Sequence, residues 1–327
     1  MEPPVPKALM SRMIQDQWLA PYLHKLTDYG LEIVISQAEP PLGPGDWLPD
    51  LDGTVALFAN GNDDVTAEVV NAAPDLKVIC RTGVGFDRVD TVAAAAGQIP
   101  VTTTPGSNSE AVADFAMGLI LACARLIPRL DRSMRAGAWQ PYLGVDVHSK
   151  TLGITGLGRI GQAVAQRARG FNMRILGVDP IVPQEHVAAL GVEKVSLDTL
   201  LSESDFITLH MPSSAETAGF IGERELRAMR STAFLINTAR GPLIDEQALA
   251  DALRKGQIAG AGLDVFADEP RTDSPFTGFD NVIVSPHIAG ATVESTAQMA
   301  ESAVDNAIAV LSGSWPREIV VNSVYSD

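Results

Sequence analysis

The segment TLGITGLGRIG, residues 151–161, limits most strongly what this chain can fold into. An apolar run leads into the pattern Gly156-x-Gly158-x-x-Gly161, and the amphipathic stretch RIGQAVAQRARGF follows at once. Glycines at this spacing permit a tight turn between a buried strand and a helix, and they let a pyrophosphate approach the backbone at the helix N-terminus. The motif alone is weak, but its place between a strand and a helix predicts a dinucleotide site on a parallel sheet.

The next apolar run, MRILGVD, ends in Asp179. A carboxylate at this point accepts hydrogen bonds from the ribose hydroxyls of an adenosine and repels a 2′-phosphate. The residues that follow, PIVPQEH, contain no arginine or lysine that would hold such a phosphate. The sequence therefore predicts NAD as the cofactor rather than NADP.

Strand-like and helix-like segments alternate along the chain, which is typical of parallel α/β sheets. A long helix is expected from the turn residues TTPGSNSE (103–110) to about residue 135, and a last helix after Thr292 reaches residue 313. Ahead of these, the expected strands are 7–11, 31–36, 55–59, 76–81 and 99–103, with helices such as 65–73 and 87–96 between them.

The fold class predicted from this alternation is α/β, with two doubly wound, parallel-sheet domains of Rossmann-like type. Because the last helix is expected to return to the first unit, the first domain is discontinuous and comprises residues 1–103 and 291–327. Residues 104–290 form the second domain, which carries the dinucleotide motif. The length of 327 residues suits two cores better than one.

Composition and charge argue against several classes of protein. A net charge of −16 disfavours nucleic acid or an anionic membrane as partner. Cys80 and Cys123 lie in no CxxC pair, so neither a disulfide framework nor a metal site is indicated. No signal-peptide pattern opens the chain, and the apolar stretch 111–127 contains Asp114 and Arg125, as a buried helix would. We therefore expect a cytoplasmic protein without a metal.

Three later strand-like segments bring ionisable side chains to their carboxyl ends. FLINTAR ends in Arg240, AGAGLDVFADEP contains Asp264 and Glu269, and NVIVSPH ends in His287. Because ligands of open parallel sheets bind outside these ends, we expect the groups to converge beside the cofactor. Taken singly, each of them has a plainer interpretation as a surface charge or a structural residue.

As a set, these side chains suit hydride transfer to the carbonyl carbon of a 2-oxo acid. Arg240 would clamp the carboxylate of the substrate, and His287 would protonate the carbonyl oxygen as the hydride arrives. Glu269 would keep the imidazole charged until then. We expect Asn237 and Thr238 to line the crevice beside Arg240.

These segments resemble the D-isomer-specific 2-hydroxyacid dehydrogenase family, in particular its phosphoglycerate dehydrogenase and glyoxylate/hydroxypyruvate reductase branches. GLGRIG, NTARGPLIDEQAL, AGLDVFADEP and PHIAGAT match family signatures, and the similarity covers nearly the whole chain. The resemblance implies an NAD-dependent oxidoreductase acting on the CH–OH group of 2-hydroxy acids, with Arg240, Glu269 and His287 as catalytic residues. The cofactor contacts that it implies are Gly156, Gly158, Arg159, Ile160, Gly161, Asp179, Thr238, Asp264 and Gly290.

The stretch RTGVGFDRVD (81–90) resembles the substrate loop of the family. There, the backbone N–H groups around Val84 and Gly85 would bind the substrate carboxylate from a flavodoxin-like, substrate-binding first domain. A plain strand-to-helix turn capped by Asp87 is the alternative interpretation. The resemblance also implies a homodimer formed by the NAD-binding domain, through the helix at 109–135 and the loop around Trp139. His210, which ends the strand-like DFITLH, is either a cofactor contact or a structural residue.

The sequence departs from phosphoglycerate-specific members in the loop NGNDD (60–64), where Asn60 takes the place of an arginine. A phosphate beside Asp63 and Asp64 would be poorly bound, although Arg81 and Arg88 offer positive charge nearby. We therefore predict a glyoxylate/hydroxypyruvate type of 2-oxo acid, with D-3-phosphoglycerate dehydrogenase as the alternative. A non-catalytic NAD-sensing scaffold is the alternative from another class, and a Rossmann methyltransferase is less favoured because it needs no Arg/Glu/His set.

Overall fold

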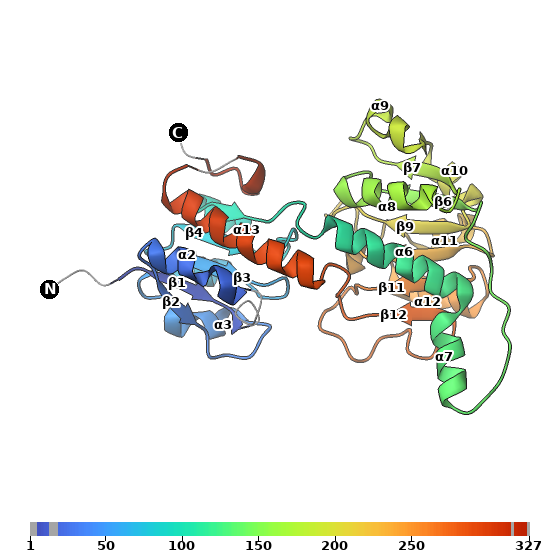
Figure 1. Ribbon diagram of the computed structural model, residues 1–327, viewed down its shortest axis with the longest axis horizontal. Helices are drawn as coiled ribbons and strands as arrows, with labels where there is room; N and C mark the ends of the chain where they lie inside the picture. Colours follow the sequence, from blue (N-terminus) through green and yellow to red (C-terminus); the bar gives the residue numbers. More distant parts are fainter. Residues whose placement is uncertain (1–4, 13–18, 315–316, 326–327) are drawn as a thin grey trace. The chain divides into compact units, whose positions relative to one another are not determined.

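The structure is a computed structural model, which describes residues 5–12, 19–314 and 317–325. Contacts divide the chain into two compact units, Met1–Asn108 with Ala291–Asp327, and Ser109–Gly290 (Figure 1). The first boundary lies at 108/109, beyond the expected 103/104, because backbone hydrogen bonds tie the turn to the first unit. Thr103 donates its N–H to the Ile319 carbonyl (3.0 Å) and Thr104 to that of Gly83 (2.9 Å).

The first unit is built on a five-stranded sheet in the order β2-β1-β3-β4-β5, and every pair is parallel. This is the strand order of flavodoxin-like sheets. The strands are β1 (Lys7–Met10), β2 (Glu32–Ile35), β3 (Thr54–Ala59), β4 (Val78–Arg81) and β5 (Val101–Thr102). The helices are α2 (Leu23–Asp28), α3 (Pro44–Trp47), α4 (Ala67–Ala72), α5 (Thr91–Ala96) and α13 (Val293–Leu311).

Two hydrophobic clusters flank this sheet, one on each face. Alternation along β1 sends Ala8 and Met10 to the cluster that includes α13, and Leu9 to the cluster that includes α4. Ala303 and Ala307 of α13 are fully buried, so the last helix belongs to the core of the first unit. The prediction of a discontinuous first domain is confirmed.

The second unit holds a seven-stranded parallel sheet in the order β12-β11-β10-β9-β6-β7-β8. The order reverses between β6 and β9, as it does in dinucleotide-binding Rossmann sheets, where ligands bind at this switch point. The strands are β6 (Thr151–Thr155), β7 (Arg174–Val178), β8 (Val192–Lys194), β9 (Phe206–Leu209), β10 (Phe234–Asn237), β11 (Gly260–Leu263) and β12 (Val282–Val284). The predicted α/β class with two doubly wound parallel sheets is confirmed.

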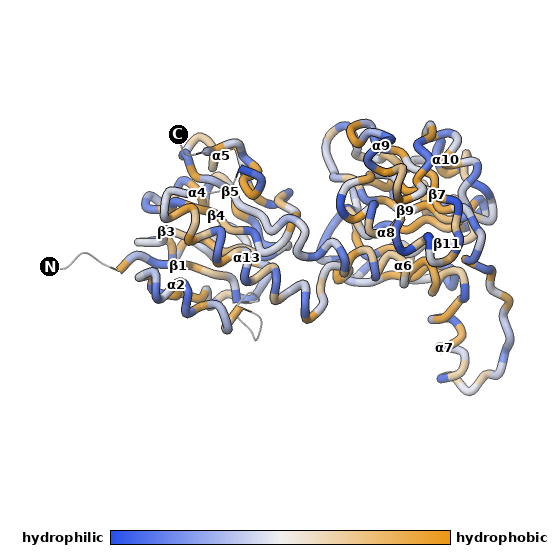
Figure 2. The backbone as a smooth tube through the Cα atoms, turned by 45° about the horizontal axis from the view of Figure 1, so that its top comes forward, coloured by the Kyte–Doolittle hydropathy of each residue, from blue (hydrophilic) through white to orange (hydrophobic). Residues whose placement is uncertain are grey.

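Helices cover both faces of the second sheet. One cluster includes residues of α6 and α8, and the other includes residues of α10, α11 and α12. The apolar strands form the central layer of this unit (Figure 2). The helices are α6 (Ser109–Arg125), α7 (Ile127–Arg135), α8 (Arg159–Arg169), α9 (Gln184–Val187), α10 (Leu197–Glu203), α11 (Glu223–Ala228) and α12 (Glu246–Arg254). Single 3-10 turns lie at Ala20–Tyr22, Leu48–Asp50, Ala188–Leu190, Gly241–Leu243 and Arg317–Ile319.

The helix expected to run unbroken to residue 135 is divided into α6 and α7, which are bent by 62°. Leu126 between them has a φ of +56°, and Pro128 stands in the first turn of α7, where its missing N–H costs nothing. The freed Ala124 carbonyl accepts a hydrogen bond from the Val145 N–H (2.8 Å). None of the described helices alone passes a length and hydropathy test for a membrane span, and only α6 with α7, taken together, does.

Candidate active site

The glycine motif forms the turn between β6 and α8, with Gly158 as the N-cap. Gly156 has a φ of +86°, and a Cβ there would lie 2.5 Å from the His210 carbonyl oxygen. A Cβ at Gly161 would lie 2.0 Å from the Gly156 carbonyl oxygen, whereas one at Gly158 would meet nothing within 4 Å. The first and third glycines therefore serve close backbone packing. The open space at the second fits the approach of a pyrophosphate to the helix N-terminus, where Arg159 and Ile160 open α8.

Asp179 follows β7 and faces the glycine turn. Its Oδ2 accepts a hydrogen bond from the Leu157 N–H (2.7 Å), and its Oδ1 accepts from the N–H groups of Ile181 and Val182 (2.8 Å each). Partial burial raises the pKa of Asp179, but these donors outweigh it and hold the pKa below its ordinary value. The ionised carboxylate has about four acceptor positions, so one is still available for a ribose hydroxyl.

Three buried polar atoms at the carboxyl edge of this sheet have no hydrogen-bond partner within the described residues. They are Thr155 Oγ1 at the end of β6, His210 Nδ1 after β9 and Thr238 Oγ1 after β10. Burial lowers the pKa of His210 to about 3, so its ring is neutral, and Nε2 lies 2.9 Å from Thr208 Oγ1. Buried polar groups are rarely left without a partner, and a polar ligand at this edge would supply one.

Asp264, predicted as a cofactor contact, is fully buried and holds the loop that carries His287. Its Oδ1 accepts from the Ser285 hydroxyl (2.6 Å) and the Ile288 N–H (3.0 Å), and its Oδ2 accepts from the Ala289 N–H (2.8 Å). His287 donates its backbone N–H to the Asp264 carbonyl (2.7 Å) and has a φ of +52°, which is uncommon outside glycine. The contact of Asp264 with the cofactor stays a prediction.

Glu269 and His287, which sequence reasoning paired, lie side by side. His287 Nδ1 is 2.7 Å from Glu269 Oε2, while Glu269 Oε1 accepts from the Phe266 N–H (2.7 Å). Burial raises the pKa of Glu269, but the hydrogen bond and charge of His287, the Phe266 N–H and the charge of Arg240 hold it below its ordinary value. An ionised Glu269 on Nδ1 leaves Nε2 of His287 for proton transfer.

Arg240 follows β10, and its turn is shaped by Asn237. The Asn237 Oδ1 accepts from the Ala239 N–H (3.0 Å), and its Nδ2 donates to the Arg240 carbonyl (2.8 Å). Asn237 is fully buried, so the expectation that it lines the crevice is wrong: its amide is used inside the turn. The guanidinium is partly exposed and donates to the Ala239 carbonyl (2.7 Å).

The remaining predicted residues lie as follows. Gly290 ends the second unit. Val84 and Gly85 belong to the turn after β4 in the first unit, where Val84 is partly exposed and Arg81 Nε donates to the Gly85 carbonyl (3.1 Å). In the described part of the chain, no group of three or more His, Cys, Asp or Glu side chains could hold a metal ion.

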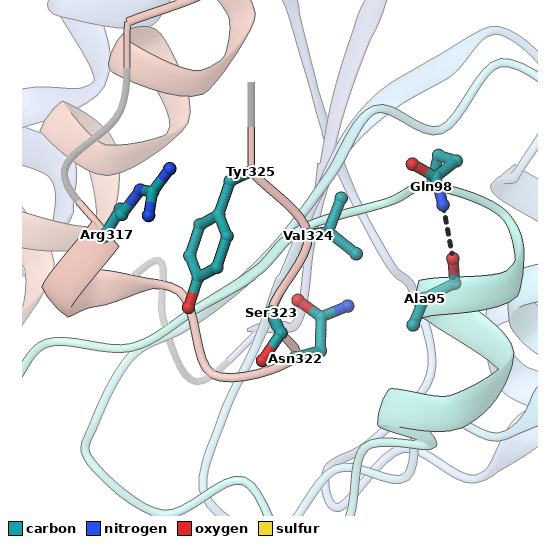
Figure 3. Close-up of a pocket in the computed structure, with 7 residues that line it drawn as sticks. All are labelled: Ala95, Gln98, Arg317, Asn322, Ser323, Val324 and Tyr325. Carbon is teal, nitrogen blue, oxygen red and sulfur yellow. Dashed lines mark hydrogen bonds between the residues drawn. The ribbon is translucent and has the colours of Figure 1, made fainter. Parts of the chain in front are cut away.

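The first unit also contains a hollow of about 400 Å³, which is not part of the predicted active site (Figure 3). The Asn322 amide in its wall is already hydrogen-bonded within the protein. Its Oδ1 accepts from the Val101 N–H (3.0 Å), and its Nδ2 donates to the Ile99 carbonyl (2.8 Å). None of the predicted site residues lines this hollow, and we assign it no ligand. It is lined by Ala95, Gln98, Arg317, Asn322, Ser323, Val324 and Tyr325.

A Rossmann sheet with this glycine turn, an ionised strand-end aspartate and a carboxylate-held histidine defines a dinucleotide-dependent oxidoreductase. Comparison with known proteins identifies the family. Residues 117–289 match the description "D-isomer specific 2-hydroxyacid dehydrogenase, NAD binding domain". A glyoxylate reductase of Korarchaeum cryptofilum is 46% identical over 284 residues, which are 85% of this chain and 85% of that protein.

Two further relatives cover much of the chain. The D-3-phosphoglycerate dehydrogenase of Mycobacterium tuberculosis is 41% identical over 84% of this chain, but the match spans only 52% of that longer protein. The structure of an NADPH-dependent glyoxylate/hydroxypyruvate reductase from Sinorhizobium meliloti, in complex with citrate, superimposes with a TM-score of 0.86. It is 31% identical, and the match covers 98% of this chain and 100% of that one.

The chain belongs to the D-isomer-specific 2-hydroxyacid dehydrogenase family. It is accordingly an NAD-dependent oxidoreductase that acts on the CH–OH group of 2-hydroxy acids. The predictions of family, fold, enzyme class and small 2-oxo or 2-hydroxy acid substrates are confirmed.

Proposed function

We propose that the protein interconverts a small, unphosphorylated 2-oxo acid of the glyoxylate/hydroxypyruvate type and its D-2-hydroxy acid, with NAD(H) as cofactor. The contact between His287 Nδ1 and Glu269 Oε2, 2.7 Å long, carries the proposal. It prepares one imidazole nitrogen for proton transfer next to a sheet edge that suits a dinucleotide.

When bound, NADH supplies the hydride that reaches the carbonyl carbon. Arg240 holds the substrate carboxylate through its planar guanidinium and polarises the adjacent carbonyl. His287 donates the proton on Nε2 to the carbonyl oxygen, and Glu269 stabilises the imidazolium until it does so. In the reverse direction Nε2 accepts the hydroxyl proton. We keep Val84 and Gly85 as backbone donors to the carboxylate, in a turn that Arg81 fixes through the Gly85 carbonyl.

The polar groups after β3 support an unphosphorylated substrate. Asn60 Nδ2 donates to Ser11 Oγ (3.0 Å), and the fully buried Asp63 accepts from the N–H groups of Leu42 (2.8 Å) and Asn60 (2.7 Å). Arg88 already pairs with Asp64 (3.0 Å). A phosphate dianion here would lie near the buried carboxylate of Asp63, whereas the cationic Arg88 already has an ion-pair partner.

A panel of 2-oxo acids tests the proposal, with NADH oxidation as the readout. Glyoxylate, hydroxypyruvate, pyruvate, 2-ketogluconate and phosphohydroxypyruvate are compared by kcat/KM. The first two should be preferred, and a preference for phosphohydroxypyruvate would instead favour D-3-phosphoglycerate dehydrogenase. NADH binding without turnover of any of them would favour an NAD-sensing scaffold.

Asp179 should give a strong preference for NADH over NADPH. Its pKa is lowered, so it is charged at neutral pH and repels a 2′-phosphate. The ratio of kcat/KM for the two cofactors measures the preference, and Asp179→Ala combined with an arginine at Ile181 should shift it toward NADPH. Ile181→Arg alone is the control that separates added attraction from lost repulsion. A wild-type ratio near one would remove Asp179 from this role.

Replacing Glu269 with glutamine should move the pH profile of 2-oxo acid reduction. The lowered pKa of Glu269 means that its charge is present throughout the usual assay range. Without that charge the His287 imidazolium is less stable, so the rate should fall at a pH about one unit lower or more. The measurement is kcat/KM against pH. A profile that overlays that of the wild type would show that Glu269 does not act on the proton of His287.

We also propose a homodimer formed through α7 and the chain after it, which lie away from the sheet of the second unit (Figure 1). No residue of α7 is buried, and Trp139 and Leu143 are 86% and 97% exposed. Such exposed apolar side chains mark interaction surfaces, and a monomer mass in sedimentation equilibrium would contradict the proposal.

We place the enzyme in the cytoplasm, where the buried thiols of Cys80 and Cys123 stay reduced, and cell fractionation tests this.

A further inference from the structure

Glu246, which sequence reasoning did not single out, bridges the loop that carries Glu269. Its Oε1 accepts a hydrogen bond from the Ala267 N–H (2.8 Å), and its Oε2 accepts from Arg271 Nη1 (2.6 Å). The two contacts lie on either side of Glu269 in the sequence. The neighbouring Phe266 N–H is taken by Glu269 itself (2.7 Å). Consecutive N–H groups of this loop are thus held by two carboxylates, one of which belongs to the proposed site.

The ion pair between Glu246 and Arg271 is largely shielded from water. The side chains of Arg271 and Glu246 are 24% and 14% exposed, whereas the ion pair of Arg254 and Asp251 near the other end of α12 is 53% and 46% exposed. Screening is weaker for the covered pair, so it can restrain the loop in a way that an exposed pair cannot. The surface pair therefore offers a matched control.

The position of Glu246 is fixed by α12, which is anchored in the core of the second unit. It is the first residue of α12, but the helix does not need it as a cap, because the Asp245 side chain accepts from the Ala248 N–H (3.0 Å). Leu249 and Leu253 anchor the helix in the hydrophobic cluster on that face of the sheet. The carboxylate of Glu246 is thus left for the loop.

The loop in turn packs on the segment that follows Arg240. A Cβ at Gly241 would lie 1.8 Å from the Phe266 carbonyl carbon and 2.3 Å from the Ala267 nitrogen, so the two backbones touch. A shift of the loop would therefore change where Glu269 lies relative to both Arg240 and His287. Displacements on the order of 1 Å at a reacting group cost about 100-fold in rate.

We propose that Glu246 and Arg271 are positioning residues of the reaction, which clamp the loop 266–271 so that Glu269 meets His287. The proposal rests on the proposed function, because it takes Glu269 and His287 as the proton-transfer pair. Neither Glu246 nor Arg271 touches the substrate; both act through Glu269.

Two single substitutions test the clamp. Glu246→Gln keeps the size and an acceptor for Ala267 but loses the charge, and Arg271→Met removes the guanidinium. Each should lower kcat by about 10-fold to 100-fold with little change in the KM for NADH. Each should also move the pH profile of 2-oxo acid reduction to lower pH, as Glu269→Gln does but by less. Arg271→Lys should restore most of kcat, and Arg254→Met should leave kcat and the profile unchanged.

A double-mutant cycle separates positioning from a general loss of structure. In the Glu269→Gln background, Glu246→Gln should have little further effect on kcat, because the residue through which it acts is already altered. Lowered melting temperatures with a wild-type pH profile in both single variants would overturn the proposal, as would an additive cycle. Where Glu246→Gln does not fold, Arg271→Met and Arg271→Lys decide the question by the same profile. A Glu269→Gln variant without any pH shift would contradict the Glu269–His287 proton-transfer pair on which the proposal rests, whereas failure of the proposed function would appear in the 2-oxo acid panel.

Discussion

Replacing His287 with alanine should lower kcat by about 10²–10⁴-fold and leave NADH affinity close to that of the wild type. Nδ1 of the ring is held by Glu269 at 2.7 Å, so Nε2 is the atom that exchanges the proton with the substrate oxygen. Alanine removes this atom, while the backbone contacts of the loop with Asp264 remain available. Steady-state kinetics with glyoxylate and a fluorescence titration with NADH measure the two quantities.

His186→Ala is the matched control for His287→Ala. His186 is an exposed residue of α9 in the same unit, and its loss should leave kcat unchanged. Turnover of His287→Ala at the wild-type rate would contradict the assignment of the general acid. A parallel loss of NADH binding would point instead to a collapse of the 285–290 loop, since Asp264 holds that loop through the neighbouring N–H groups.

The fold was predictable because its signals are local. In β10, Phe234 and Ile236 pack into the cluster on one face and Leu235 into the cluster on the other, so the strand is apolar from Phe234 to Ile236. The break at Leu126 was missed although Pro128 signals it, because an apolar pattern that continues past a proline resembles one long helix. Where a helix bends also depends on what receives its freed carbonyls, here the Val145 N–H.

The candidate site was predictable as a set of residue types at strand ends, but not as a set of contacts. Arg240, Glu269 and His287 follow parallel strands, and the topology alone brings their ends to one edge. Glu246 differs, because an acid in the first turn of a helix is already explained by the helix dipole. Its pairing with Arg271 arises only when α12 and the loop after β11 are packed together.

Arg240 offers the other large effect, in the variant Arg240→Lys. A lysine keeps the charge, but its ammonium cannot reproduce the planar fork of the guanidinium. Arg240 Nη1 donates to the Ala239 carbonyl (2.7 Å), and a guanidinium carries five N–H donors in a fixed planar arrangement that matches a carboxylate. Loss of a charge-assisted contact in a desolvated site costs about 2–5 kcal/mol, so kcat/KM should fall by roughly 30-fold or more.

The decisive comparison is between substrates with and without a carboxylate. Because Asn237 shapes the turn through backbone contacts, the variant should keep the turn, and NADH affinity should change little. The loss in kcat/KM should be large for a good 2-oxo acid and small for any aldehyde or ketone that is turned over without a carboxylate. Arg230→Lys, which alters an arginine paired with Asp205 (3.1 Å), should leave both rates unchanged. An equal loss for both kinds of substrate would mean that the Arg240 guanidinium does not act on the substrate carboxylate. An unchanged kcat/KM would reduce Arg240 to a loop arginine at the end of a buried strand.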